Sequence, residues 1–132
     1  MKFSRTGSSF LLAGLAVVFG LVLTTTAMAD TSKNDQKFVK EAASGGMLEV
    51  KLGEVAMNQA TNPAVKEFAQ RLINDHSKAN SELLSLAEKK NIDVPKEMNQ
   101  EHRSMYEHLS QLKGADFDRQ YMRHMIEDHI QD

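Results

Sequence analysis

Four side chains with metal-binding chemistry interrupt the apolar stripes of this sequence: Glu49, His76, His102 and His129. Each lies three, four or seven positions from apolar residues, so helical geometry turns all four toward a core. Carboxylate oxygens and imidazole nitrogens are ligands for zinc, copper and iron. The sequence contains no cysteine, which excludes thiolate ligands, thiol nucleophiles and disulfides. The four residues therefore form a candidate metal site.

Other interpretations of the same residues stay open. In the first, outer ligands join the four, namely Asp75, Asp128, Met105 and Met125. In the second, soft thioether and imidazole groups bind Cu(I); this set is Met98, His102, Met105, Met122, Met125 and His129. In the third no ion is bound, and hydrogen bonds from Glu49 to His76 and from His102 to His129 hold the helices in register.

The spacing of the four residues indicates a duplication. Glu49 and His76 are 27 positions apart, as are His102 and His129, and the offset between the two pairs is 53. The same offset aligns Phe68 with Tyr121 and the phrase LINDH (72–76) with MIEDH (125–129). Because each predicted turn falls midway between the paired residues, we expect two helical hairpins whose polar pairs face inward.

Duplicated hairpins with inward Glu and His resemble a di-iron bundle, which requires two Glu-x-x-His motifs. The residues three positions before His76, His102 and His129 are Ile73, Asn99 and Ile126. The bridging carboxylates are therefore missing, and we expect no oxidase, ferroxidase or other enzyme. Ser-His-Asp sets and glycine-rich phosphate loops are absent as well.

Helical periodicity predicts an all-α domain with helices over 34–60, 63–90 and 96–112, and a fourth helix with Asp116 in its first turn. Asn62 and Pro63 have the residue types of an N-cap and a first helical position. Ser44 falls on the expected polar face of the first helix, and Gly45, Gly46 and Gly53 predict close helix approach. An extended connector over 91–97 would bring the two polar pairs to one height.

Residues 36–132 resemble the bacterial family named domain of unknown function 4142. The resemblance rests on FVKEAASGGMLEV (38–50), TNPAVKEFA (61–69), DHSKAN (75–80), and Phe117-Asp118-Arg119 through Asp128-His129. It implies export and a ferritin-like antiparallel four-helix bundle, without an established activity. Members usually continue through a longer fourth helix, so the last helix here is expected to be truncated.

The N-terminus predicts export. Lys2 and Arg5 precede the apolar run 10–23 and the small-residue site Ala27-Met28-Ala29, which are typical of a signal peptide over residues 1–29 that is cut before Asp30. The apolar run is shorter than the ~20 residues needed to span a bilayer. A short polar leader over 30–35 would then precede the domain.

The charge and composition of the chain limit the classes of binding partner. The whole chain carries a formal charge of −2, and cations alternate with anions, so a nucleic-acid interface is excluded. We expect a periplasmic protein that is not integral to the membrane, with outer-membrane association, a homo-oligomer or an envelope protein partner left open. The expected role is a non-enzymatic structural, stress-related or interaction module. The alternatives are a binder of Zn, Cu or Fe and a degenerate di-iron redox or storage protein.

Overall fold

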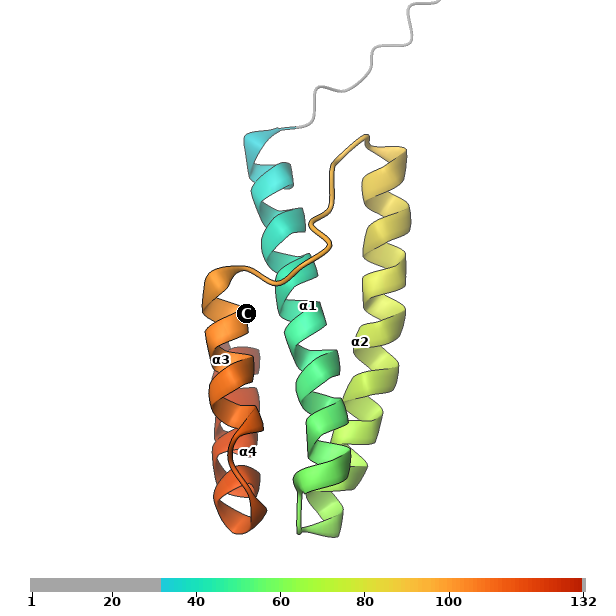
Figure 1. Ribbon diagram of the computed structural model, residues 1–132. Coiled ribbons are helices and arrows are strands. Elements are labelled where there is room, and N and C mark those ends of the chain that lie inside the picture. The colour runs from blue at the N-terminus through green and yellow to red at the C-terminus, as the bar shows by residue number, and fades with distance from the viewer. Residues whose placement is uncertain (1–31, 132) are drawn as a thin grey trace, which may run out of the picture.

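The computed structural model describes residues 32–131, so the predicted signal peptide and its cleavage site lie outside the described residues. Its helices are α1 (Lys33–Gln59), α2 (Pro63–Lys89), α3 (Gln100–Ser110) and α4 (Gly114–Gln131), and the described residues contain no strand. They form two hairpins, α1–α2 and α3–α4 (Figure 1). This confirms the all-α, four-helix bundle. None of the described helices is long and apolar enough to cross a membrane.

The ends of the first two helices follow from their capping residues. Ser32 caps α1 by accepting a hydrogen bond from the N–H of Asp35 at 3.0 Å, so the helix begins inside the segment expected as a polar leader. Asn62 caps α2 through the N–H of Ala64 at 2.9 Å, and Pro63 follows as the first helical residue. The predicted Asn-Pro start of α2 is therefore confirmed.

The third helix is shorter than predicted, spanning 100–110 in place of 96–112. Asn99 is extended and accepts a hydrogen bond from the N–H of His102 at 2.8 Å, so the helix starts after it. The connector descends from the end of α2 alongside α1, and both hairpin turns lie at the same end of the bundle (Figure 1). This long connector carries the chain back along α1, but it does not bring His102 level with Glu49.

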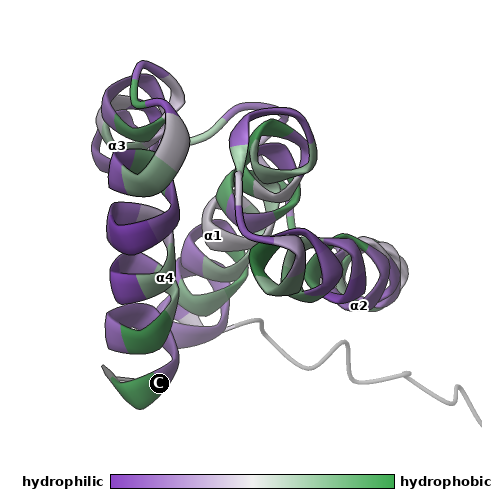
Figure 2. Cartoon of the chain, turned by 90° about the horizontal axis from the view of Figure 1, so that it is seen from below, coloured by the Kyte–Doolittle hydropathy of each residue, from purple (hydrophilic) through white to green (hydrophobic). Residues whose placement is uncertain are grey.

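Helix α1 is the central element and packs against the other three. Seen from below, it lies between α2 and the α3–α4 pair (Figure 2). The main core combines Leu48, Leu52 and Ala56 of α1 with residues of all three neighbours: Val65, Ala69 and Leu72; Leu109; Phe117, Tyr121 and Met125. This arrangement gives α1 the position from which one side chain reaches two other helices.

Glycine allows the close contact between α1 and α2. A Cβ at Gly46 would overlap the side chain of Asn80, and one at Gly53 would lie 2.6 Å from Cγ1 of Ile73. Gly45 differs, because a Cβ there would meet nothing closer than the Cε1 atom of His102 at 3.7 Å. The predicted close approach is therefore confirmed at Gly46 and Gly53 only.

The α4 helix is tied to the turn between α1 and α2 by one carboxylate. Asp118 accepts hydrogen bonds from Thr61 Oγ1 at 2.7 Å, from the N–H of Asn62 at 2.8 Å and from the N–H of Thr61 at 3.1 Å. These contacts join residues 56 and 57 positions apart. They fix the lower end of α4 relative to the first hairpin.

Candidate metal centre

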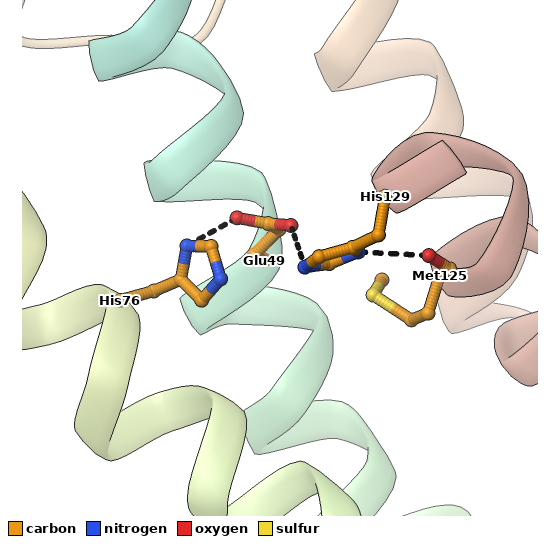
Figure 3. A network of polar contacts seen from close by, with 4 residues as sticks. All are labelled: Glu49, His76, Met125 and His129. Carbon is orange, nitrogen blue, oxygen red and sulfur yellow. Dashed lines mark hydrogen bonds and ion pairs between the residues drawn. The ribbon is translucent and has the colours of Figure 1, made fainter. Parts of the chain in front are cut away.

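Glu49 lies at the centre of the candidate site. Its side chain projects from α1 and the residue is only 5% exposed. One carboxylate oxygen, Oε2, pairs with Nδ1 of His76 from α2, and the other, Oε1, lies 3.6 Å from Nε2 of His129 from α4 (Figure 3). One ligand atom from each of the three residues lies within 4.8 Å of the other two. The bundle therefore brings together three of the four predicted site residues.

The ring of His129 is oriented by its own helix. Nδ1 lies 2.8 Å from the carbonyl oxygen of Met125, one turn earlier in α4 (Figure 3). A carbonyl only accepts hydrogen bonds, so Nδ1 carries the proton and donates it. In the neutral ring, Nε2 therefore has a lone pair directed at the Glu49 carboxylate. The side chain is 46% exposed, so this part of the site is open to solvent.

The environment of His76 favours its neutral form. Burial lowers its pKa below the ordinary histidine value, and the neighbouring His129 lowers it further, while Asp75 and Asp128 act in the opposite direction. The rings of His76 and His129 meet edge to face with centroids 5.8 Å apart. Neutral imidazole is the form that binds metals, and because Nδ1 of His76 donates its proton to the Glu49 carboxylate, the neutral ring has its lone pair on Nε2.

His102 does not join the other three, and its predicted pairing with His129 is wrong. Its Nδ1 lies 2.7 Å from Oγ of Ser44, and the same Oγ accepts a hydrogen bond from the N–H of Asn99 at 2.8 Å. Ser44 is only 1% exposed, which corrects its predicted place on a polar face. Because α3 begins at residue 100, His102 stands beside Ser44, about 7.5 Å along α1 from Glu49.

None of the four suggested outer ligands joins the three-residue group. Asp75 is exposed, and the half-buried Asp128 borders a groove beside His76. Met125 is buried in the core, and its backbone oxygen accepts a hydrogen bond from His129. Met105 is partly buried and packs against the core. Met98 and Met122 also pack against this core. Core packing therefore accounts for the methionines of the suggested Cu(I) set.

A family model described as a domain of unknown function, DUF4142, matches residues 21–132. The chain belongs to this family. No curated protein and no solved structure matches the chain. Membership in DUF4142 assigns no activity, so any function of this domain must be argued from its geometry.

Two buried polar atoms of α4 in this DUF4142 domain were not predicted from the sequence. The hydroxyl of Tyr121 and Nε2 of His124 are buried without a hydrogen-bond partner. Burial raises the pKa of Tyr121, and the charge of Glu49 raises it further; burial also lowers the pKa of His124. His124 lies seven positions after Phe117 and three after Tyr121, and this spacing is the sequence signal that places it toward the core. Tyr121 carried a signal, since the 53-residue offset aligns it with Phe68.

Proposed function

We propose that this domain binds a single divalent transition-metal ion through Glu49, His76 and His129. The observation that carries the proposal is the orientation of His129. Its protonated Nδ1 is held by the Met125 carbonyl, so Nε2 directs a lone pair at a buried carboxylate 3.6 Å away. A lone pair facing a carboxylate is unfavourable unless a proton or a metal cation lies between them.

The surroundings of the three residues match those of metal ligands in general. Histidine ligands almost always donate their second ring nitrogen to a carbonyl or carboxylate, as His129 does to Met125. In tetrahedral zinc sites the ligand atoms lie about 3.3 Å apart, given metal–ligand bonds of about 2.0–2.1 Å. Glu49 and His129 are already near that separation at 3.6 Å. Small side-chain movements would therefore complete the site.

The types of the three ligands limit which metal ions the site suits. Two imidazoles and one carboxylate suit Zn²⁺, Fe²⁺ and Cu²⁺, whereas Cu(I) prefers the thioethers that this fold uses in its core. Three protein ligands leave a fourth position for water or a small molecule. The sequence supplies no Glu-x-x-His motif, so we propose one ion and no di-iron oxidase chemistry. Residues 1–29 favour an exported setting, in which the ion would be acquired outside the cytosol.

Isothermal titration of the metal-free protein with Zn²⁺ tests the proposal. We expect one ion per chain, and Glu49→Gln, His76→Ala and His129→Ala should each weaken binding at least tenfold. His102→Ala is the matched control and should stay within about threefold of the wild type, since His102 is held by Ser44. If the wild type and the His129→Ala variant bind equally, Glu49 and the histidines act as a hydrogen-bonded structural network, and the proposal fails.

A further inference from the structure

The candidate metal centre opens into a groove of about 690 Å³ between α1 and α2. Glu49 and His76 form the polar end of the groove, together with His102 and Asp128. Pockets of this size are typical of small-molecule sites. The groove therefore gives the fourth coordination position of the ion a neighbourhood in which a ligand could be bound and selected.

The opposite end of the groove is apolar except for Glu41. Phe38 and Ala42 line it from α1, and Ala79 and Leu83 line it from α2. Since α1 and α2 are antiparallel, these residues follow one another away from Glu49 and His76. Phe38 stands about 16 Å from Glu49 along α1 at 1.5 Å per residue. Phe38 is 67% exposed, so a ligand in the groove would remove apolar surface from water.

His102 presents a hydrogen-bond donor at the polar end. Oγ of Ser44 accepts a hydrogen bond from the N–H of Asn99. The Ser44 hydroxyl then donates its own proton to Nδ1 of His102. Nδ1 therefore carries no proton, and the neutral ring has its N–H at Nε2. A protonated nitrogen cannot bind a metal but can donate a hydrogen bond to a ligand that binds the metal through another atom. This is why His102 lines the groove as a recognition group and not as a ligand.

From these features we propose that the groove binds a monocarboxylate with a medium-length acyl chain. This proposal rests on the metal site proposed above. One carboxylate oxygen takes the open position of the ion, the other accepts Nε2–H of His102, and the chain extends past Ala79 toward Phe38. Glu41 lies about one turn from Phe38 on α1 and lines the same end of the groove, where it disfavours a second negative charge on the ligand.

Calorimetry on the zinc-loaded full chain with sodium octanoate tests this assignment. We expect octanoate to bind at least tenfold more tightly than acetate, and more tightly than octanedioate, whose second carboxylate would lie at the apolar end. Ala79→Trp should weaken octanoate binding at least tenfold while the affinity for Zn²⁺ stays within threefold. Lys78→Trp is the matched control, because the Lys78 side chain is 80% exposed and does not line the groove, and it should change neither affinity.

The outcomes separate the two proposals. Octanoate binding no tighter than acetate binding, or equal binding by the wild type and the Ala79→Trp variant, overturns the groove assignment and leaves the metal site standing. A wild-type protein that does not bind Zn²⁺ overturns both. A circular dichroism melt of each variant verifies that the introduced tryptophan leaves the helices folded.

Discussion

His76 and His129 are 53 positions apart in the sequence, and their rings meet edge to face with centroids 5.8 Å apart. Phe68 and Tyr121 have the same separation and the same kind of contact, at 6.3 Å. Equivalent residues of the two hairpins therefore face one another across the molecule. Glu49 lies between α2 and α4, so a single carboxylate reaches both equivalent histidines.

The glycines of α1 give a matched pair of substitutions. Gly53→Ala should lower the free energy of unfolding by about 1–2 kcal/mol, since a Cβ would lie 2.6 Å from Ile73 and overpacking outweighs the gain in helix propensity. Gly45→Ala has room, with its nearest neighbour at 3.7 Å, and should raise stability by up to about 1 kcal/mol. Urea unfolding followed by circular dichroism measures both. Equal effects of the two substitutions would contradict the packing described here.

The link between α4 and the first hairpin depends on Asp118. Asp118→Ala removes the acceptor for Thr61 and Asn62 and should cost about 2 kcal/mol of unfolding free energy. Asp116→Ala is the control: Asp116 pairs with Arg119 at the surface, where an ion pair contributes about 0–1 kcal/mol. A loss of the same size in both variants would argue against the Asp118 link.

Asp118 also confers acid sensitivity. Its slight burial raises its pKa, but hydrogen bonds from Thr61 and Asn62 and the charge of Lys66 lower the pKa by more, so the net shift is downward. The folded pKa is thus below the unfolded value of about 3.9, so this stabilisation is complete above that pH and is lost as the pH falls through the folded pKa. Asp118→Ala should show a shallower loss of stability than the wild type in this range.

The buried nitrogen of His124 makes the wild-type protein less stable than it could be. His124→Leu should raise the unfolding free energy by about 1 kcal/mol at pH 7, since Nε2 is buried without a partner. Burial lowers the pKa of His124, so its neutral form stabilises the fold above the unfolded value of about 6.5, and stability falls as the pH drops toward the folded pKa. The advantage of the leucine variant should therefore grow between pH 7 and pH 5.

Thermal melts of His124→Leu and His108→Leu at pH 7, 6 and 5 provide the comparison. His108 is exposed and its ring lies 3.4 Å from Gln120, so its replacement should change stability by less than about 0.5 kcal/mol at pH 7. A His124 variant that is less stable than the wild type would mean that Nε2 has a hydrogen-bond partner in solution.

Helical periodicity and the 53-residue repeat were sufficient to predict the hairpins, the Asn62–Pro63 join and the inward direction of Glu49 and His76. Periodicity depends on burial along each helix, which a sequence records directly. Periodicity does not record the residue at which a capping side chain begins or ends a helix. Asn99 shortened α3, and this shift placed His102 beside Ser44 and away from Glu49.

The contact of Glu49 with His129 of the second hairpin could not be predicted from the sequence either. Internal symmetry paired Glu49 with His76 and His102 with His129, one pair for each hairpin. The central position of α1 instead lets the buried Glu49 contact histidines of both hairpins. That choice is set by the packing of α1 between α2 and α4, a long-range property that residue spacing within each hairpin does not contain.

The histidine ring nitrogens test the central claim most directly. Long-range nitrogen–proton correlation NMR of the uniformly ¹⁵N-labelled protein, before and after one equivalent of Zn²⁺, reports the protonation and metal binding of every ring. We predict Nδ1–H on His129 and Nε2–H on His102 in the metal-free protein, and large zinc-induced nitrogen shifts for His76 and His129 only. Zinc shifts at His102, or no shift at His129, would contradict the metal centre proposed for this fold.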